Sequence, residues 1–570
     1  MTENDTDLAT RTRDWIDHDP DPSDRQELNR LLEAGQWALL RDRMGGTLEF
    51  GTAGIRGAVE AGSNRMNRAV VVRTTAGLSN FLHASRSGPV VVGFDGRTSS
   101  RQFASDTVGV LAAAGHDVHY FAEPVPTPLV AYASLQFGAA AAIVITASHN
   151  PPADNGYKVY DENGAQIVPP VDTEIAAAIA DVGPARAVPR VEDALEAPTA
   201  SIHRIDEEAV YAAYRAEVDG VRPRTGGSDL KVAYTPIHGV GWRFVRRLVT
   251  DAGHHGIRVV ETQRDPDGRF PTVSFPNPEE PGAMDLAIQL GNEIGADLVI
   301  ANDPDADRLA VVLPDAESGW RPLSGNQVGV LLADWLLEAW AEDERPIVIN
   351  SIVSSPMLAT VASLHGAHFE QTLTGFKWIA NAALDLEAEG KGRFVFGYEE
   401  ALGYSVGPVV RDKDGMSAAL LFVDMAAGLA ETGMTVQDRL IDLYRRAGLW
   451  VSAQHSVTKA GSEGLAEISA AMERLGSDVP TSLGTRDIVE VTDYRTGADQ
   501  RPRWLAETPL VALRLTGDAR VLIRPSGTEP KLKIYVDLPG KPEGDLVANE
   551  ASLMEEAKAM AAEAATFIGL

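Results

Sequence analysis

From about residue 88 onward, two kinds of segment alternate along the chain. Short runs of Val, Ile and Ala bounded by turn residues, such as GPVVVGFD at 88–95 and AAIVITASHN at 141–150, predict strands buried on both faces of a sheet. The intervening stretches at 101–115 and 128–139 have the length and composition of crossover helices. A third apolar run lies at 116–125, so residues 88–150 predict a βαβαβ unit with a parallel sheet.

The same order of segments returns twice. Strand-like runs at 229–239, 256–262 and 296–302 are separated by helical stretches at 241–253 and 281–295. A third round has strand-like runs at 345–355, 367–376 and 392–400, with helical stretches between them. We therefore expect three α/β units of similar plan.

The last part of the chain has a different pattern. After a helical stretch at 434–448, short strand-like runs follow at close spacing, at 486–494, 510–518, 519–527 and 531–538, and an Ala- and Glu-rich helical stretch ends the chain. This pattern predicts an antiparallel sheet with a flanking helix. The predicted fold class is α/β, with three related βαβαβ-type domains and a smaller C-terminal α+β domain around a central cleft. The predicted domains are 1–208, 209–317, 318–445 and 446–570.

Composition and charge narrow the function classes. The chain has 570 residues, so several domains are expected, and its net charge of −30 argues against a general nucleic-acid-binding surface. It has no cysteine, which excludes disulfides, thiolate catalysis and Cys-ligated metal sites. The acidic beginning lacks the order of a signal peptide and no apolar run has membrane-spanning length, so we expect a cytoplasmic protein without membrane or nucleic-acid partners.

In each of the three predicted α/β units, the last strand-like run ends in a polar cluster: TASHN, DPDADR and GYEE. Ligands of open α/β sheets bind beyond the carboxyl ends of the strands. We therefore expect the three clusters to converge on one cleft.

The cluster DPDADR, at 303–308, has carboxylates at alternate positions directly after a predicted buried strand. Three oxygen ligands in one short loop suit a hard cation such as Mg²⁺. Arg308 and Pro314 stand where an EF-hand needs Gly and Glu, so that motif is excluded. The alternative is a solvated acidic turn.

Ser148, in TASHN, has no hydrolase frame, because the Gly-x-Ser-x-Gly pattern is missing and no Asp–His pair can be assigned to it. Judged locally, a serine at a strand end is usually structural. Lys158 lies ten residues on, beyond the Asn155-Gly156 turn, and could fold back to act on a proton or a phosphate oxygen. His149 could equally be a neighbour that only fixes the loop.

Two further segments are candidate anion sites. RPSGTEPK, at 524–531, combines an arginine fork, small hydroxyls and a glycine, which suits a phosphate; a plain loop between strands is the alternative. GTAGIRG, at 51–57, places glycines around Arg56 and is a weaker signal. HGVG, at 238–241, lacks the third glycine of a dinucleotide fingerprint and is interpreted as a turn.

The ordered set TASHNP, DPDADR, GYEE and RPSGTEPK resembles the α-D-phosphohexomutases, the phosphoglucomutase and phosphomannomutase superfamily. The resemblance runs from about Gly51 to the C-terminus. The fold that it implies, three related α/β domains and a smaller fourth one around a cleft, agrees with the repeated pattern. The features GYEEALGY, RDKDG and WIDHDPDP look most like the longer branch, which contains phosphoglucomutases, phosphopentomutases and glucose bisphosphate synthases.

The resemblance also implies roles for single residues. Ser148 would carry a phosphoryl group in the resting enzyme and, as phosphoserine, would complete a Mg²⁺ site with Asp303, Asp305 and Asp307. Arg56 would support the phosphoserine, Lys158 and His149 would belong to the transfer site, and Arg308 would lie near the transferring phosphate. The sugar would contact Thr374, Gly375, Lys377, Glu399 and Glu400. The phosphate that is not transferred would be held by Arg524, Ser526, Gly527 and Thr528.

The implied activity moves a phosphoryl group between O1 and O6 of glucose phosphate through a phosphoserine enzyme and a sugar bisphosphate such as glucose 1,6-bisphosphate. Phosphomannomutase activity is the first alternative, because members of the superfamily are often dual, and phosphopentomutase activity is the second. Ala401 stands where hexose-specific relatives commonly have serine, so one expected sugar contact is not supplied. A Mg²⁺-dependent sugar phosphatase and a non-catalytic sugar-phosphate-binding protein are the more distant ones. The expected partners are small sugar phosphates, and the sequence leaves the oligomeric state open.

Overall fold

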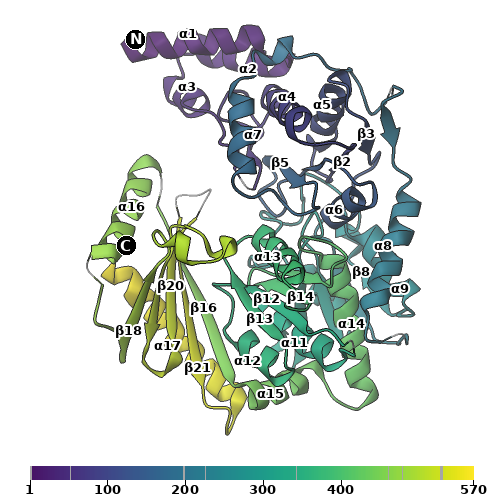
Figure 1. Cartoon of the computed structure of the whole chain (residues 1–570), viewed down its shortest axis with the longest axis vertical. Helices are drawn as coiled ribbons and strands as arrows, with labels where there is room; N and C mark the ends of the chain where they lie inside the picture. The colour runs from purple at the N-terminus through teal and green to yellow at the C-terminus, as the bar shows by residue number, and fades with distance from the viewer. Residues whose placement is uncertain are drawn as a thin grey trace. The chain divides into compact units, whose positions relative to one another are not determined.

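The computed structural model describes residues 3–51, 53–196, 199–224, 226–341, 343–459, 461–477, 479–526 and 531–570. Figure 1 shows the helices and strands of the chain, coloured by residue number. The chain divides into two compact units. The first comprises residues 1–322 and 405–423, and the second comprises Leu323–Tyr404 and Asp424–Leu570.

The first sheet belongs to the first α/β domain and has the strand order β1-β5-β4-β2-β3-β6. Its strands are β1 (Ile55–Ala58), β2 (Val90–Phe94), β3 (Val118–Tyr120), β4 (Ala141–Ile145), β5 (Asp154–Asp161) and β6 (Ile202–Arg204). Its helices are α4 (Arg68–Ser85), α5 (Ser100–Ala113), α6 (Thr127–Gln136), α7 (Val171–Ala180) and the short η1 (Ala185–Ala187). The three strands predicted from the apolar runs are parallel to one another, with β2 between β3 and β4.

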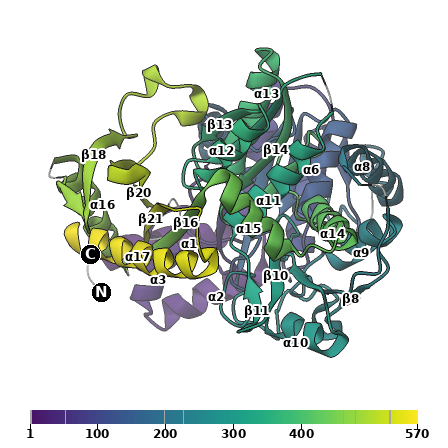
Figure 2. The same cartoon turned by 90° about the horizontal axis from the view of Figure 1, so that it is seen from below.

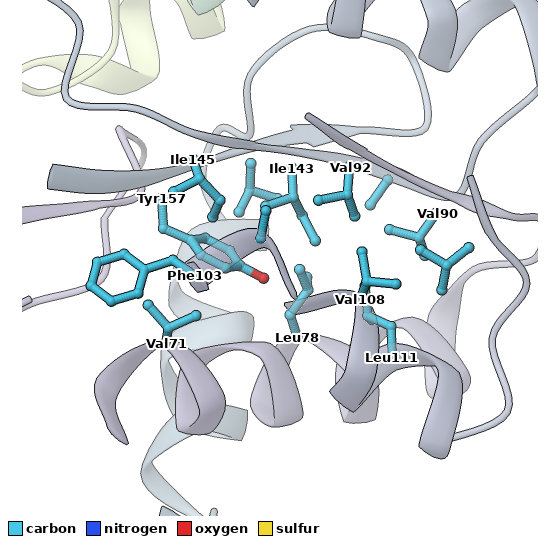
Figure 3. Packing of buried hydrophobic residues seen from close by; sticks show 14 of the residues in the cluster. Val71, Leu78, Val90, Val92, Phe103, Val108, Leu111, Ile143, Ile145 and Tyr157 are labelled. Carbon is cyan, nitrogen blue, oxygen red and sulfur yellow. The ribbon is translucent and has the colours of Figure 1, made fainter. Parts of the chain in front are cut away.

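The core of this domain lies between the sheet and helices α4 and α5. Figure 3 shows Val90, Val92 and Ile143 on the sheet facing Leu78 and Leu111 on the two helices. All five side chains are fully buried. Burial of apolar surface contributes about 25 cal/mol per Å² to stability, so this layer gives the rigid base from which the strand-end loops project.

The second domain repeats the strand order of the first. Its sheet is ordered β11-β10-β9-β7-β8, with β7 parallel to both β8 and β9. The elements are α8 (Glu207–Val221), β7 (Val232–Thr235), α9 (Trp242–Asp251), β8 (Ile257–Val259), η2 (Glu261–Gln263), α10 (Asp285–Ile294), β9 (Leu298–Ala301), β10 (Ala310–Asp315) and β11 (Gly319–Pro322).

The third domain has the same plan again, with its sheet ordered β13-β12-β14-β15 and β12 parallel to both β13 and β14. Its elements are α11 (Gly325–Glu338), β12 (Pro346–Ser351), α12 (Met357–Leu364), β13 (His368–Thr372), α13 (Phe376–Ala388), β14 (Arg393–Glu399) and β15 (Gly403–Val406). Helices α14 (Gly415–Glu431) and α15 (Val436–Ala447) follow. The predicted repeat of three α/β units is confirmed.

The C-terminal domain contains an antiparallel sheet ordered β16-β21-β20-β19-β18-β17. Its strands are β16 (Leu449–Thr458), β17 (Ser482–Leu483), β18 (Arg486–Asp493), β19 (Val511–Leu515), β20 (Arg520–Pro525) and β21 (Lys531–Gly540). Its helices are α16 (Gly461–Ser477), η3 (Ala498–Gln500), η4 (Arg503–Leu505), η5 (Thr516–Asp518) and α17 (Leu546–Phe567). Figure 2 shows α17 running along β16 and β21. The predicted α+β domain is confirmed, although the pattern analysis did not identify β16.

The N-terminal segment forms helices that the sequence analysis did not predict: α1 (Glu3–His18), α2 (Pro22–Glu33) and α3 (Trp37–Met44). They share a small core that includes Leu8, Leu28 and Leu40. These helices are mostly exposed, and only a narrow apolar stripe marks them in the sequence.

Among the described residues, no single helix is long and apolar enough to cross a membrane. The pair α14 and α15, bent by 91° at its break, passes that test by length and composition. Because α14 is almost entirely buried, core packing accounts for its apolar character.

Candidate functional site

Ser148 lies in the loop that follows β4, and its backbone has an unusual conformation. Its φ angle is +51°, in the left-handed region that residues other than glycine seldom adopt. The backbone N–H of Ser148 donates to Thr146 Oγ1 at 2.8 Å, and the residue is 2% exposed. The loop thus holds this serine in a defined, buried position.

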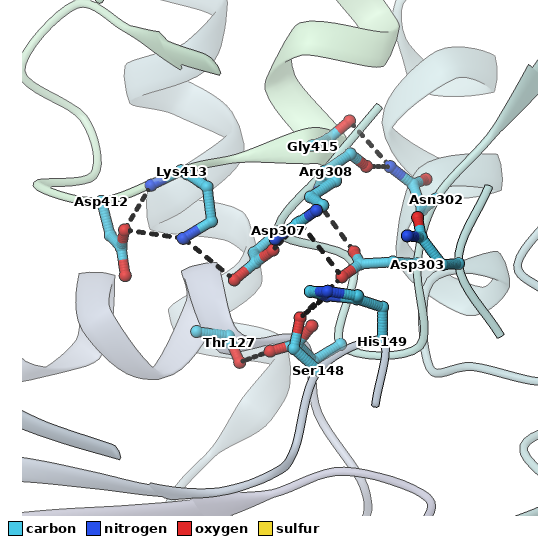
Figure 4. Close-up of polar contacts among 12 residues, drawn as sticks. Thr127, Ser148, His149, Asn302, Asp303, Asp307, Arg308, Asp412, Lys413 and Gly415 are labelled. Atoms are coloured by element: carbon cyan, nitrogen blue, oxygen red, sulfur yellow. Dashed lines mark hydrogen bonds and ion pairs between the residues drawn. The ribbon is translucent and has the colours of Figure 1, made fainter. Parts of the chain in front are cut away.

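The Ser148 hydroxyl faces the polar cluster of the second domain. Its Oγ donates to Asp303 Oδ2 at 2.9 Å and lies 3.0 Å from His149 Nδ1 (Figure 4). Asp303 follows β9, as Ser148 follows β4, so the ends of corresponding strands in two domains meet. The predicted convergence of the first two clusters is therefore present within the first unit.

The aspartate loop, 303–308, is a compact turn and not a solvated one. Asp303, Asp305 and Asp307 are at most 1% exposed, and one carboxylate oxygen of each lies within 4.8 Å of the others. Ala306, at the turn, has a φ of +57°. The alternative of a solvated acidic turn is wrong for this loop, because its three carboxylates are buried. Buried carboxylates need polar or charged partners in place of water.

HGVG lies against this loop. Val240 N–H donates to Pro304 O at 2.9 Å, and a Cβ on Gly239 would lie 2.4 Å from Pro304 Cα. The segment is a turn. Because Gly239 has no side chain, the loop after β7 packs directly against the aspartate loop.

Two lysines supply positive charge to the aspartates. Lys158, on β5, is 2% exposed and donates to Asp305 Oδ2 at 2.8 Å and to Asp307 Oδ2 at 3.0 Å. Lys413 Nζ lies 3.3 Å from Asp307 Oδ2 and 3.4 Å from Asp412 Oδ1. Burial alone would lower the pKa of Lys158, but the carboxylates of Asp305 and Asp307 outweigh it and raise that pKa above its ordinary value.

The three carboxylates differ in their electrostatic environment. Burial, with the charges of Asp307 and Asp305, raises the pKa of Asp303 well above its ordinary value. Burial acts in the same sense on Asp307, but Lys158, Lys413 and Arg308 outweigh it and hold the pKa of Asp307 below its ordinary value. Positive groups therefore compensate the charge of Asp307 more fully than that of Asp303.

The residues present fit a bound divalent cation. Asp305 Oδ1 and Asp307 Oδ1 are buried and have no hydrogen-bond partner among the described residues. Orphaned carboxylate oxygens are costly in a protein interior, and a hard cation such as Mg²⁺ satisfies them with the oxygen ligands that it prefers.

Arg308, His149 and Arg56 lie around this cluster. Arg308 Nε is 3.9 Å from Asp303 Oδ2 and from Asp307 Oδ1. Arg56 lies on β1 opposite Gly156 of β5, and its Nε is buried without a hydrogen-bond partner in the described structure. Burial lowers the pKa of His149 well below its ordinary value, and the charges of Arg308 and Arg56 act in the same direction.

The second unit holds the third polar cluster. Glu399, at the end of β14, accepts a hydrogen bond from the Gly375 N–H at 2.7 Å. Glu400 Oε2 accepts from Ser351 Oγ at 3.2 Å and from Ser354 Oγ at 3.3 Å. The parallel strands β12, β13 and β14 end at the same edge of their sheet, and the loops beyond that edge hold these residues.

Within the same unit, the fourth cluster approaches the third. Burial and the charge of Glu400 raise the pKa of the Tyr535 hydroxyl, and the positive charge of Arg524 acts in the opposite direction. Arg520 also donates to the Ser354 carbonyl. The charges of Arg524 and Glu400 thus both act on the Tyr535 hydroxyl.

The remaining predicted residues belong to the second unit. Ser526 donates its N–H to Lys531 O at 2.7 Å, and Gly527 and Thr528 lie outside the described residues. Thr374 is half-buried. Lys377 Nζ lies 5.8 Å from the ring centre of Trp378. Convergence of the third and fourth clusters with the first two stays a prediction.

The sequence analysis missed several residues that the structure adds to the site. Thr127 donates through Oγ1 to Asp305 Oδ2 at 2.8 Å, and Arg97 donates to the carbonyl of Ser148 at 2.7 Å. Lys413 lies in the RDKDG segment, which the sequence marks only as a feature of the family branch. Ser351 and Ser354, whose hydroxyls donate to Glu400, are two further such residues. Each is far in sequence from its partner, so no spacing pattern marks it.

Comparison with known families gives matches over most of the chain. Residues 47–185, 210–317 and 324–447 match the phosphoglucomutase/phosphomannomutase alpha/beta/alpha domains I, II and III, in that order. Residues 489–553 match the C-terminal domain of the same family. The matched segments contain every predicted cluster.

Among individual relatives, the chain is 39% identical to a Haemophilus influenzae protein named "Probable phosphomannomutase", over 84% of this chain and 93% of that protein. It is 34% identical to the human phosphopentomutase, over 94% and 92% of the two chains. It is 33% identical to the human glucose 1,6-bisphosphate synthase, over 97% and 92%.

Among solved structures, the open form of the Paramecium phosphoglucomutase parafusin superposes with a TM-score of 0.67 at 18% identity, over 92% of this chain and 97% of that one. A phosphoglucomutase/phosphomannomutase family protein of Burkholderia thailandensis gives 0.63 at 21% identity, over 90% and 96%. These two matches concern the fold.

Proposed function

The chain belongs to the phosphoglucomutase/phosphomannomutase family and is a phosphosugar mutase of that superfamily, and from this premise we propose that it interconverts glucose 1-phosphate and glucose 6-phosphate through a phosphorylated Ser148. The observation that carries the proposal is the contact between Ser148 Oγ and Asp303 Oδ2 at 2.9 Å. It joins a buried hydroxyl from one domain to a buried carboxylate cluster from the next.

The proposed cycle conserves phosphate. In the first half, a free sugar hydroxyl attacks the phosphorus on Ser148, the bond from phosphorus to Ser148 Oγ breaks, and a bond to the sugar oxygen forms. The hydroxyl proton leaves the sugar and Ser148 Oγ ends protonated, so the products are a sugar bisphosphate and free Ser148. In the second half, Ser148 takes the other phosphoryl group from the reoriented bisphosphate, and the released sugar oxygen gains the proton.

Positive charge close to the transferring group supports this chemistry. Phosphoryl transfer needs in-line positioning and stabilisation of charge on the equatorial oxygens. Asp303, Asp305 and Asp307 would hold Mg²⁺, which supplies such charge when it is bound. Arg308 and Arg56 supply further positive charge from the protein. His149 and Lys158 are the two candidates for moving the hydroxyl proton, and the pH–rate profiles of His149→Gln and Lys158→Met distinguish them.

The second unit supplies groups suited to the sugar and to its other phosphate. We propose that Glu399, Glu400 and Lys377 contact sugar hydroxyls, together with the Thr374-Gly375 segment. Arg524, with Ser526, Gly527 and Thr528, would hold the phosphate that stays in place, because an arginine fork and small hydroxyl donors match a phosphate. The proposed partners are therefore small sugar phosphates, with glucose 1,6-bisphosphate as intermediate and activator.

A second candidate substrate is a pentose phosphate. The human phosphopentomutase is 34% identical to this chain over 94% of its length. Ala401 also lacks the hydroxyl that hexose-specific relatives commonly present at this point of the loop, so one contact to a hexose would be absent. Mannose 1-phosphate is an equally strong alternative, because members of this family often accept both hexoses and the Haemophilus influenzae protein named "Probable phosphomannomutase" is 39% identical to this chain.

The test measures product and phosphate together. Purified protein with Mg²⁺ and a trace of glucose 1,6-bisphosphate is given the 1-phosphates of glucose, mannose, ribose and deoxyribose in parallel, and ³¹P NMR follows each reaction. We expect isomerised sugar phosphate with total organic phosphate conserved, and the fastest turnover with glucose. Inorganic phosphate released in step with substrate loss would instead identify a phosphatase, and no reaction with any of the four would indicate a binding protein.

Replacement of Ser148 tests the phosphoserine itself. The Ser148→Ala variant should lose turnover by a factor on the order of 10⁴ or more, because it removes the group that carries the phosphoryl. Peptide mass analysis of the wild-type protein should find a phosphoryl group on the peptide that contains Ser148. Ser134→Ala, which removes another buried serine hydroxyl from the same domain, is the matched control and should keep its activity.

A further inference from the structure

Arg97 lies beneath the loop that carries Ser148. It follows β2 in the segment FDGR, and its side chain is 2% exposed. Nη2 donates to the carbonyls of Ser148 at 2.7 Å and Asn150 at 2.6 Å. Nη1 donates to the carbonyls of Pro151 at 2.7 Å and Asp154 at 2.9 Å. One guanidinium therefore binds four backbone carbonyl oxygens in the segment 148–154.

The guanidinium is itself held in place from its own side. Its Nε lies 3.3 Å from Asp95 Oδ2. The other carboxylate oxygen of Asp95 accepts the Arg97 N–H at 3.0 Å and the Ser100 hydroxyl at 2.6 Å. The guanidinium carbon also lies 5.2 Å from the ring centre of Phe270. These contacts fix the orientation of the planar guanidinium, so that its N–H groups point at the loop carbonyls.

The contacts also show what Arg97 does not do. A guanidinium has four N–H groups on its two terminal nitrogens and one on Nε. The terminal nitrogens already make four hydrogen bonds to the loop, and Nε, which makes no hydrogen bond among the described residues, is ion-paired with Asp95. Arg97 is therefore occupied as a support of the loop, whereas Arg56 and Arg308 lie around the aspartate cluster.

Ser148 needs such support because its backbone is in a conformation that costs energy. A residue other than glycine at φ near +50° persists only where its surroundings hold it there. The Ser148 carbonyl defines the plane of the peptide that leads to His149, so the bond from Arg97 fixes that plane. The direction of the Ser148 side chain toward Asp303 depends on the same plane.

We propose that Arg97 is a positioning residue for phosphoryl transfer: it holds the Ser148 loop so that Oγ stays aimed at the aspartate cluster. This inference rests on the proposed function and adds a residue to it. Misplacement of a reacting oxygen by about 1 Å can lower a rate roughly 100-fold without weakening substrate binding, so the effect should fall on kcat and not on KM.

The test compares Arg97→Lys with Arg101→Lys. Lysine keeps the charge but has no fork, so it cannot reproduce all four bonds. We expect kcat for glucose 1-phosphate to fall roughly 10- to 100-fold with KM within about twofold of the wild-type value. Arg101, on the neighbouring helix α5, also donates to a backbone carbonyl but is half exposed, and Arg101→Lys should leave both constants unchanged.

Two milder variants keep the proposal testable if Arg97→Lys does not fold. Asp95→Asn and Ser100→Ala loosen the hold on the guanidinium and should lower kcat by a smaller factor, again with KM unchanged. Wild-type kcat in folded Arg97→Lys, or in both milder variants if Arg97→Lys is unfolded, would overturn the proposal. A rise in KM equal to the loss in kcat/KM would also overturn it, because it would place Arg97 in substrate binding.

The experiment separates this inference from the proposed function. If wild-type protein isomerises none of the sugar phosphates, the proposed function fails before Arg97 is considered. If the wild type and Arg101→Lys are active and Arg97→Lys matches them, the mutase assignment stands and the positioning role is wrong.

Discussion

At the scale of single residues, two carboxylates of the aspartate loop have one oxygen bound by lysine and one oxygen without a hydrogen bond. Asp305 Oδ1 and Asp307 Oδ1 are buried without hydrogen-bond partners in the described part of the chain, while their other oxygens bind Lys158. Several buried negative charges so close together repel one another, and a cation is the simplest group that relieves the repulsion. This arrangement predicts how the protein responds to loss of one carboxylate or of the metal.

We predict that Asp305→Asn abolishes the Mg²⁺-dependent activity and leaves the fold intact. The substitution removes one ligand charge and also the charged partner of the buried Lys158 amine, 2.8 Å away, so the melting temperature without metal should fall moderately while the protein still folds. Calorimetric titration with Mg²⁺ measures the affinity, and Asp285→Asn, an exposed position on α10, is the control. Unchanged Mg²⁺ affinity in Asp305→Asn would contradict the assignment.

Removal of the metal should have the same consequence. We predict that incubation with EDTA stops the wild-type reaction and that added Mg²⁺ restores it, because Asp303, Asp305 and Asp307 offer only oxygen ligands. The same treatment should lower the melting temperature slightly, since a ligand that binds the folded state stabilises it. Activity that persists in excess chelator would show that the cluster does not hold a functional metal.

At the scale of elements, the molecule places chemistry on loops that follow corresponding strands. β4, β9 and β14 occupy equivalent places in the three α/β sheets, and the loops after them carry Ser148, the aspartates and the Glu399-Glu400 pair. Rigid strands set where each loop starts, and packing under the loop sets where it goes. The aspartate loop depends in this way on the HGVG turn beneath it.

We predict that Gly239→Ala weakens Mg²⁺ binding by displacing the aspartate loop. The added Cβ would lie 2.4 Å from Pro304 Cα and 2.5 Å from Pro304 O, and backbone cannot yield as a side-chain end can. The overpacking should cost about 1–3 kcal/mol of stability and raise the dissociation constant for Mg²⁺. In Gly220→Ala, on α8, the new Cβ would meet no atom within 4 Å, so this control should bind Mg²⁺ normally.

A buried carboxylate joins helices of the second unit. Asp334 on α11 is fully buried and accepts hydrogen bonds from His365 at 2.8 Å and from Arg446 at 2.7 Å, with Arg439 2.7 Å away. Burial alone would raise the pKa of Asp334, but the hydrogen bonds from Arg446 and His365 and the charges of Arg439 and Arg446 outweigh it. The pKa therefore lies below its ordinary value of 3.8.

The lowered pKa predicts a pH-dependent contribution to stability. A carboxyl whose pKa is depressed by folding stabilises the fold above the unfolded-state pKa, and that contribution is lost as the pH falls through the folded-state pKa. We expect Asp334→Asn to cost about 3 kcal/mol at pH 7, and the difference from wild type to shrink below pH ~3.8. Calorimetric melting across this range measures it. The control is Asp442→Asn, which removes only a partly exposed partner of Arg446 and should change little at any pH.

At the scale of the whole molecule, the proposed cycle asks one sugar phosphate to use groups from both compact units. Ser148 and the aspartates belong to the first unit, and Glu399, Glu400 and Arg524 belong to the second. The phosphoserine must also be kept from water, since its hydrolysis would stop the cycle. A ligand that contacts both units should therefore draw them together.

We predict that glucose 1,6-bisphosphate lowers the radius of gyration of the Ser148→Ala protein, which cannot exchange the phosphoryl group. Small-angle X-ray scattering with and without the ligand measures the change, and free glucose at the same concentration is the control. Identical scattering curves at saturating bisphosphate would contradict the expected closure.

Much of the architecture could be predicted from local patterns. Apolar runs of strand length and intervening helical stretches are local properties, and they identified the three α/β units and most of the C-terminal sheet. The strand β16 was not predicted because apolar and polar residues alternate only weakly in its second half, residues 454–458. Helices α1 to α3 were missed because they bury only a narrow stripe. Contacts with segments far away in the sequence bury these elements, and a local sequence pattern does not reveal such contacts.

The sequence by itself determined the order of the domains, the family and the chemical types available: a serine, three alternating aspartates, paired glutamates and an arginine loop. These follow from residue identity and spacing along the chain. Only the tertiary structure decided that Ser148 Oγ faces Asp303, that Lys158 is bound to Asp305 and Asp307, and that Arg97 supports the serine loop. Those contacts join residues 51 to 155 positions apart, and such distances close only when separate strands and domains pack together.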